Sequence, residues 1–286
     1  MSQTYELDIE EVEYLRHGDK PFMARIFKPR GQGSFPAVVE AHGGAWVDGH
    51  RAQNDAVNRP IAAGGVVVVA LDFRAPPDAT YPGSIADFHY AIRWLKANAA
   101  RFNTRADMIG AMGTSSGGHI AVLAALKPHD PRYAAIPLPS APGMDAKVPF
   151  VVTLWPVICP IGRFRDPTAN PPDKVDGPAR RQLRYWLTEA AMAEGSAVLA
   201  LSRGDRVALP NIFYLQNAAD PLHPRALLEQ FVTNYRSRGG KVQVELIEGM
   251  PYDLVRSTPD APAAKQSVSE IVGFIRRQTE SQVAAA

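Results

Sequence analysis

The sequence has little of several features that would assign it to particular classes of protein. It holds a single cysteine, Cys159, so no disulfide can form within the chain, and its apolar neighbours predict a buried, unreactive thiol. No apolar run approaches the ~20 residues that a membrane-spanning helix requires. The formal net charge is +2, which gives no electrostatic reason to expect a nucleic acid or an anionic membrane as a partner.

The start of the chain also lacks a targeting pattern. Residues 1–13 are acidic and show no basic segment followed by an apolar one, which favours a cytoplasmic protein. We expect a small-molecule substrate, no metal and no cofactor, and a homodimer is left open. The length of 286 residues, 46% of them hydrophobic, suits one α/β domain over residues 1–286 with a large core.

What the sequence does contain is an alternation of apolar runs with segments of helical spacing. Residues 65–71 form an apolar run typical of a strand buried on both faces of a sheet, and residues 84–99 place apolar side chains at helical intervals. Such an alternation predicts a mostly parallel central sheet flanked by helices. Further strands are expected at 38–41, 108–112, 148–155, 211–216 and 241–248, further helices at 119–126 and 264–279, and a leading hairpin from 12–15 and 23–27.

A glycine-rich turn, G-T-S-S-G-G at residues 113–118, lies between one such strand and one such helix. Strand, G-x-S-x-G and helix in that order are the context of a nucleophile elbow, a sharp turn that exposes a serine above the sheet. The turn leaves little room for side chains at Gly113, Gly117 and Gly118. The motif predicts Ser115 as the nucleophile, next to a helix N-terminus that favours negative charge.

A second motif, H-G-G-A-W at residues 42–46, follows the apolar run 35–41. An H-G-G sequence after a strand and upstream of G-x-S-x-G supplies part of an oxyanion hole. Glycine lets backbone N–H groups face a developing negative charge without a Cβ in the way. We therefore expect the main-chain N–H groups of Gly43, Gly44 and Ser116 to form the oxyanion hole.

With these two motifs, and with connecting segments at 71–77, 81–87 and 93–95, the chain resembles the hormone-sensitive-lipase-like and related small carboxylesterases. The resemblance extends from about residue 38 to the last helix. It implies an α/β-hydrolase fold in which the serine nucleophile, an acid and a histidine follow in that order along the chain.

The acid and the base are less regular than the nucleophile. Asp220, which follows the run 211–216, matches the family's acid. The family's histidine comes after the last core strand, where this chain has Tyr252, and no histidine occurs after His223. The resemblance therefore implies an altered base at Tyr252, a phenol that is a weaker base than imidazole at neutral pH but a good proton donor. His223 would reach the site only if its loop folds inward, and we expect it to pack at the surface.

Residues 161–210 are too many for a simple crossover between two core strands. We expect this segment to form a cap insertion over the mouth of the pocket, helical over 179–187. The residues expected to contact the substrate, from this segment and elsewhere, are Trp46, Phe164, Tyr185, Trp186 and, if its loop folds inward, His223.

Three functions fit these observations. The first is a serine hydrolase of the carboxylesterase or lactonase class that acts on a small-molecule ester through Ser115 with an altered base. We favour it because the elbow, the oxyanion hole and the acid are all retained. The second is a non-hydrolytic carboxylesterase-like lyase or cyclase in which Tyr252 moves protons and the hole holds an enolate-like oxygen. The third is a ligand-binding protein without turnover, as the plant gibberellin receptors resemble this family and have lost its histidine.

Overall fold

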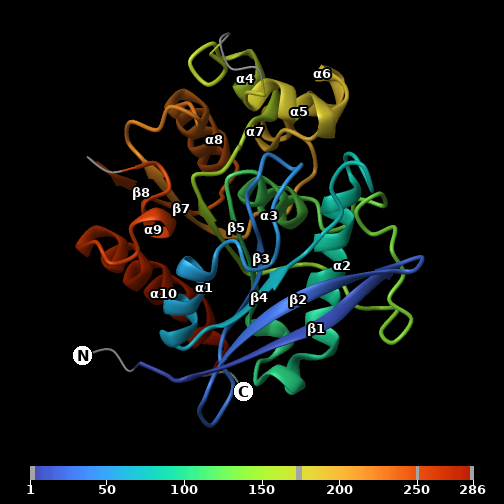
Figure 1. Cartoon of the computed structure of the whole chain (residues 1–286), viewed down its shortest axis with the longest axis vertical. Helices are drawn as coiled ribbons and strands as arrows, with labels where there is room; N and C mark the ends of the chain where they lie inside the picture. Colours follow the sequence, from blue (N-terminus) through green and yellow to red (C-terminus); the bar gives the residue numbers. More distant parts are fainter. Residues whose placement is uncertain (1–3, 172–175, 249–250, 284–286) are drawn as a thin grey trace.

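An eight-stranded sheet runs through the centre of the molecule, and helices cover both of its faces (Figure 1). The computed structural model describes residues 4–171, 176–248 and 251–283, with side chains up to residue 280. The strands lie in the order β1-β2-β4-β3-β5-β6-β7-β8. The first hairpin is antiparallel and joins β4 antiparallel, and every pair from β4 to β8 is parallel. The predicted fold class is therefore confirmed.

The strands of the parallel part begin and end within two residues of the predicted positions, whereas the two hairpin strands are longer than predicted. Their bounds are Leu7–His17 (β1), Lys20–Pro29 (β2), Ala37–Ala41 (β3), Val67–Leu71 (β4), Ile109–Thr114 (β5), Phe150–Leu154 (β6), Asn211–Asn217 (β7) and Val242–Ile247 (β8).

The helices fill the connections between the strands. The α-helices are Asp55–Ala63 (α1), Gly83–Ala97 (α2), Ser116–Leu126 (α3), Pro160–Arg165 (α4), Pro178–Trp186 (α5), Glu189–Glu194 (α6), Ala197–Ser202 (α7), Arg225–Ser237 (α8), Leu254–Ser257 (α9) and Pro262–Val283 (α10). Two short 3-10 helices lie at Ala99–Phe102 and Ala106–Met108.

β4 shows why its run of apolar residues does not alternate with polar ones. Val67, Val69 and Leu71 pack into a core that includes side chains of α2 and α3. Val68 and Ala70 pack into a second core, which includes side chains of α1 and α10. Both faces of the strand are therefore buried, as expected for a central parallel strand, and Figure 1 shows α2 on one side of the sheet and α10 on the other.

The 161–210 segment contains α5, α6 and α7 and most of α4, and lies above the carboxyl ends of the central strands (Figure 1). It contacts the 42–50 loop directly. Arg181 Nη2 donates to the Gly44 carbonyl oxygen at 3.4 Å and forms an ion pair with Asp48. The predicted helix within the segment is confirmed as α5, whereas residues 172–175 lie outside the described ranges.

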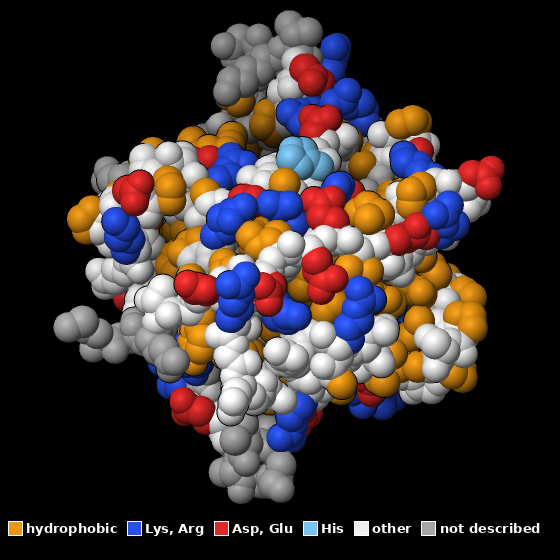
Figure 2. Space-filling view, turned by 60° about the horizontal axis from the view of Figure 1, so that its bottom comes forward, with side chains coloured by type: hydrophobic (Ala, Val, Ile, Leu, Met, Phe, Trp, Pro, Cys, Tyr) orange, Lys and Arg blue, Asp and Glu red, His pale blue; other side chains and the backbone are white. Residues whose placement is uncertain are grey.

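The molecular surface is mixed in charge. On the face drawn in Figure 2, basic and acidic side chains are interspersed with apolar ones, and neither sign covers a large area. This agrees with the small net charge of the chain. Of the helices that the structure describes, none has both the length and the apolar character to span a bilayer.

A buried acid lies beneath the glycine-rich turn. Glu40 at the end of β3 is 1% exposed and accepts hydrogen bonds from Asn54 Nδ2 at 2.7 Å and Asn58 Nδ2 at 3.3 Å. Asn54 Nδ2 also contacts Thr114 Oγ1 at 3.0 Å, which links this network to the residue before Ser115. Burial raises the pKa of Glu40 to about 7, although the two amide hydrogen bonds oppose the shift.

We expect Glu40→Gln to remove one pH dependence of stability. The pKa of the carboxyl rises from 4.5 to about 7 on folding, so its contribution to the free energy of unfolding is complete below pH 4.5 and declines as the pH rises towards 7. At ~1.4 kcal/mol per pH unit, the loss is on the order of 3 kcal/mol. A glutamine cannot ionise, and the unpartnered Oδ1 of Asn58 can accept from its amide if the Asn58 side chain flips.

Urea unfolding of both proteins at pH 5 and pH 8 measures this effect. The wild-type protein should lose more stability between the two pH values than Glu40→Gln does. An equal loss in both proteins would contradict the assignment of this dependence to Glu40.

Candidate active site

The turn between β5 and α3 holds Ser115 in a strained backbone conformation, with φ 52° and ψ −119°. Its glycines are required by close backbone contacts. A Cβ on Gly117 would lie 2.0 Å from the Ala41 carbonyl oxygen, and a Cβ on Gly113 would lie 2.3 Å from the Gly117 carbonyl oxygen. The steric argument made from the sequence is therefore confirmed at these positions, and the Ser115 side chain is held at the carboxyl end of the sheet.

Ser115 meets a histidine and an aspartate there. His223 Nε2 lies 3.3 Å from Ser115 Oγ, and His223 Nδ1 lies 2.8 Å from Asp220 Oδ2. With a proton on Nδ1 for the carboxylate, Nε2 presents a lone pair to the serine hydroxyl. The three side chains are thus in line for transfer of the serine proton to the imidazole.

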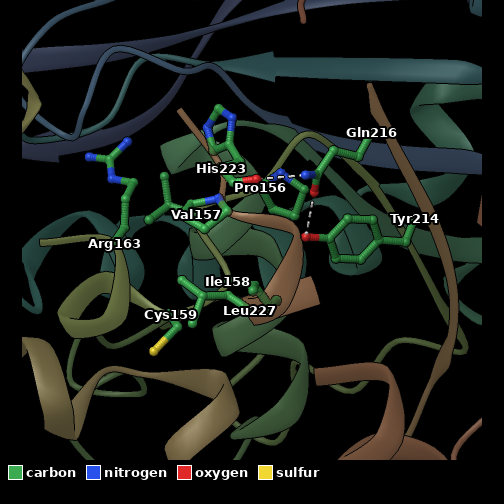
Figure 3. A pocket seen from close by; sticks show the side chains of 10 residues that line it. Pro156, Val157, Ile158, Cys159, Arg163, Tyr214, Gln216, His223 and Leu227 are labelled. Carbon is green, nitrogen blue, oxygen red and sulfur yellow. Dashed lines mark hydrogen bonds between the residues drawn. The ribbon is translucent and has the colours of Figure 1, made fainter. Parts of the chain in front are cut away.

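The loop after β7 orients this pair. Asp220 Oδ1 accepts the backbone N–H groups of Leu222 at 2.8 Å and His223 at 3.0 Å, which closes a tight turn around the carboxylate. Gln216 Nε2 donates to the His223 carbonyl oxygen at 2.7 Å (Figure 3). Because aspartate and histidine belong to one turn, the sequence D-P-L-H at 220–223 fixes their separation locally.

The structure corrects the prediction for His223. We expected it to pack at the surface, but it is 4% exposed, and among the described residues it is the side chain that forms a hydrogen bond with Ser115 Oγ. The turn described above folds the imidazole inward, which sequence spacing alone did not indicate.

Tyr252 lies close to His223, and within the described ranges no hydrogen bond joins it to Ser115. Its ring packs edge-on against Trp155 at 6.5 Å between ring centres and lies 5.9 Å from the ring of His223. The prediction that Tyr252 acts on Ser115 in place of a histidine stays a prediction, although the side chain that hydrogen-bonds Ser115 Oγ is that of His223. Burial raises the pKa of the Tyr252 phenol, so even less of it is ionised and able to accept a proton at neutral pH. Residues 249 and 250, the start of the predicted histidine turn, lie outside the described ranges.

The H-G-G-A-W loop lies against the nucleophile. A Cβ on Gly43 would be 3.3 Å from Ser115 Cβ, so the backbone of Gly43 runs beside the serine. Gly44 has φ +119°, a conformation that favours glycine. His42 braces this loop through Nδ1, 2.6 Å from the Gly43 carbonyl oxygen, and stacks on Phe73. The third expected oxyanion-hole donor, the N–H of Ser116, is at the first position of α3.

Three of the predicted pocket residues form a closed cluster instead. Trp46 stacks on Tyr185 at 5.7 Å and meets Trp186 edge-on at 5.4 Å, and none of the three is more than 1% exposed. Trp46 Nε1 donates to His119 Nδ1 at 3.3 Å, so His119 is part of the same packed cluster. Mutual packing of large aromatic rings leaves no space for a ligand between them. These rings join the 161–210 segment to the H-G-G-A-W loop, and Phe164 packs partly buried against the same core.

A small cavity lies beside His223, lined among others by Arg163, Tyr214 and Gln216 (Figure 3). Its volume of about 10 Å³ is about that of one water molecule. Cys159 also lines it and is buried with a free thiol, as predicted.

The surroundings of His223 keep its imidazole neutral at physiological pH. Burial lowers its pKa below the usual 6.5, the hydrogen bond to Asp220 opposes the shift, and the nearby charge of Arg163 lowers the pKa further. A neutral imidazole is the form that accepts a proton. Within the described ranges, no group of three or more His, Cys, Asp or Glu side chains is placed to hold a metal ion.

The architecture is the α/β-hydrolase fold. The chain superimposes on a hyperthermophilic esterase from Pyrobaculum calidifontis with a TM-score of 0.76 and 23% identity, over 95% of this chain and 86% of that one. It superimposes on esterase B from Lactobacillus rhamnosis with a TM-score of 0.78 and 18% identity, over 99% of this chain and 89% of that one.

Each of the sequence comparisons covers less than half of the chain. The BD-FAE family model matches residues 25–152. The chain is 40% identical over 121 residues to esterase LipC of Mycobacterium tuberculosis, which is 42% of this chain and 29% of that protein. It is 35% identical over 122 residues to carboxylesterase NlhH of the same species, which is 42% of this chain and 38% of that protein. The matched stretch thus spans about a third of these curated relatives.

Proposed function

We propose that the chain is a carboxylic-ester hydrolase in which Ser115, His223 and Asp220 form the catalytic triad. The observation that carries the proposal is the position of the His223 imidazole between the Ser115 hydroxyl and the Asp220 carboxylate. Its Nε2 lies 3.3 Å from the serine oxygen, and its Nδ1 lies 2.8 Å from the carboxylate. The names of the esterase relatives support the same reaction class. The substrate is a small-molecule ester or lactone.

In this mechanism His223 Nε2 takes the proton of Ser115 Oγ as the oxygen attacks the ester carbonyl carbon. Asp220 holds the imidazole in the required tautomer and stabilises the imidazolium that forms. The imidazolium then protonates the departing alcohol, which leaves an acyl group on Ser115. A water molecule, deprotonated by His223, attacks this acyl-enzyme and releases the carboxylic acid.

The backbone N–H groups of Gly43, Gly44 and Ser116 are proposed to hold the negative oxygen of the tetrahedral intermediate. The proximity of Gly43 to Ser115 and the position of Ser116 at the start of α3 support this assignment. Such donors stabilise charge that develops in the transition state, and the helix N-terminus contributes in the same direction.

The 161–210 segment is proposed to act as a cap on this site. Its Arg181 contacts the Gly44 carbonyl, and its aromatic side chains pack on Trp46, so the segment is anchored to the oxyanion-hole loop. Two alternatives assume that no imidazole serves Ser115. They are a lyase or cyclase that uses Tyr252 and a receptor without turnover. Both are less well supported because His223 lies beside Ser115.

Rapid mixing with a p-nitrophenyl ester of a short acid tests the proposed function. We expect a burst of p-nitrophenol close to one equivalent per chain or, if deacylation is fast, steady turnover without a burst. Quenching the reaction with acid should then yield a peptide acylated at Ser115 in mass spectrometry. Ser237→Ala, which changes an exposed serine of α8, serves as the matched control and should behave like the wild-type protein. Neither ester cleavage nor acylation of Ser115 would contradict the proposal.

A further inference from the structure

Arg163 is a buried cation that forms no ion pair within the described ranges, although the charge of Asp220 lies near enough to act on it. It belongs to α4, is 4% exposed, and donates from Nε and Nη2 to a single acceptor, Gln182 Oε1, at 3.1 and 2.8 Å. Across the described ranges, no acidic side chain forms an ion pair with it. By contrast, Arg165 on the same helix is exposed and pairs with Glu189. Burying a charge without a direct ion pair is costly. The charge of Asp220 offsets this cost only in part, since burial still lowers the pKa of Arg163.

The guanidinium of Arg163 lies near the H-G-G-A-W loop and near the proposed base. Its central carbon lies 5.5 Å from the ring centre of Trp46, the last residue of the H-G-G-A-W motif. Arg163 and His223 line the same small cavity. In Figure 3 both side chains extend towards the top of the view, away from Cys159.

This cation opposes the proposed reaction as long as it is unpaired. Burial lowers the pKa of Arg163 to about 10, so the side chain remains charged at neutral pH. Its charge lowers the pKa of His223 and thus disfavours the imidazolium that proton transfer from Ser115 creates. An anion placed on Arg163 would add to the effect of Asp220 and offset the influence of this charge on His223.

We propose that Arg163 recognises a carboxylate on the substrate, so that the preferred substrate is an ester that carries a second, free carboxylate. The inference rests on the proposed ester hydrolysis and adds its substrate class. Gln182 Oε1 accepts from Nε and from one N–H of Nη2, which leaves both N–H groups of Nη1 and the second one of Nη2 to donate to a carboxylate. The cavity beside Arg163, about 10 Å³, has the size for one carboxylate oxygen.

Two matched pairs of esters test the proposal. Monoethyl glutarate against ethyl valerate places the charge on the acyl side, and O-butyrylglycolate against propyl butyrate places it on the alcohol side. A hydrogen bond to a charged group is worth about 10- to 100-fold in binding. We expect a preference of that size in kcat/KM for the charged member of one pair.

Substitutions assign this preference to Arg163. Arg163→Met should remove it, Arg163→Lys should retain part of it, and the matched control Arg165→Met should retain all of it. If Arg163→Met does not fold, the preference for a carboxylate is tested by inhibition of the wild-type protein. Butyrate should then inhibit hydrolysis of ethyl valerate at least about tenfold more strongly than its neutral analogue butanamide.

A pH profile separates recognition from a purely structural role. With the charged ester, the pKa of His223 obtained from the pH dependence of kcat should exceed the one obtained from kcat/KM. The first value describes the complex with substrate, in which the bound carboxylate offsets the charge of Arg163, and the second describes the free protein. With the neutral ester the two values should coincide.

The failures of the two proposals can be told apart. Equal kcat/KM for the charged and neutral members of both pairs, with the esters hydrolysed, would overturn the carboxylate proposal and leave the hydrolase standing. If no ester is hydrolysed, the hydrolase proposal fails. Thermal unfolding in the presence of butyrate or butanamide then tests carboxylate recognition by Arg163. A rise in Tm with butyrate but not with butanamide supports recognition by Arg163, and equal effects overturn it.

Discussion

Ser115→Ala and His223→Ala are each expected to lower kcat for a p-nitrophenyl ester by a factor on the order of 10⁶, and the double variant no further. The two groups act as a unit, since the serine is a weak nucleophile without a base and the base has no proton to take without the serine. Residual catalysis in all three variants would come from the oxyanion hole and from substrate binding.

Steady-state kinetics of the two single variants and the double variant measures this prediction, with circular dichroism as the check on folding. Independent roles would give losses that multiply in the double variant. That outcome, or a His223→Ala variant with activity close to wild type, would contradict the relay between the two residues.

Asp220→Asn is expected to lower kcat by about 10⁴ while leaving the fold intact. Asp220 Oδ1 accepts two backbone N–H groups, from Leu222 and His223, and an asparagine retains these bonds only with its oxygen in the same place. Its NH₂ group then faces His223 Nδ1, which must present a lone pair to it. The ring proton is thereby moved to Nε2, so the imidazole can no longer accept the proton of Ser115.

The measurement is kcat for Asp220→Asn and for the control Asp145→Asn, an exposed aspartate paired with Lys96. The control should keep wild-type activity, and both variants should unfold at about the wild-type temperature. A loss of less than about tenfold in Asp220→Asn would show that the carboxylate does not orient the base.

The parts of the site that the sequence predicted are those fixed by local sterics. Gly113 and Gly117 are required by contacts within the turn and with the end of β3, so a glycine pattern in the right order identified the elbow. The parallel strands were recognisable for a similar reason, because burial on both faces leaves an unbroken apolar run such as β4.

The hydrogen bond between His223 and Ser115 was not predicted because it depends on how one turn folds. We looked for a histidine after β8, and the chain has Tyr252 there, whereas His223 comes after β7 and turns inward around Asp220. The available signal was local: His223 is the last histidine in the chain and lies three residues after the predicted acid. An aspartate that caps its own turn can hold a side chain at that spacing.

The aromatic pocket was mispredicted for a different reason. Trp46 and Tyr185 are far apart in the sequence, and nothing in either segment indicates that their rings stack on each other at 5.7 Å. Whether an aromatic side chain lines a pocket or fills it is decided by tertiary packing, which hydrophobic pattern does not encode.

The direct test of the central claim, that the base is His223 and not Tyr252, is kcat/KM of Tyr252→Phe on a p-nitrophenyl ester. This substitution keeps the ring against Trp155 and His223 and removes only the hydroxyl. General acid–base assistance is worth ~10²–10⁴-fold, so the residue that provides it must show a loss of that size. We predict that Tyr252→Phe retains kcat/KM to within about threefold, because the hydroxyl takes no part in proton transfer. A loss of about 10²-fold or more in correctly folded Tyr252→Phe would contradict the account, because it would assign the proton transfer to the phenol.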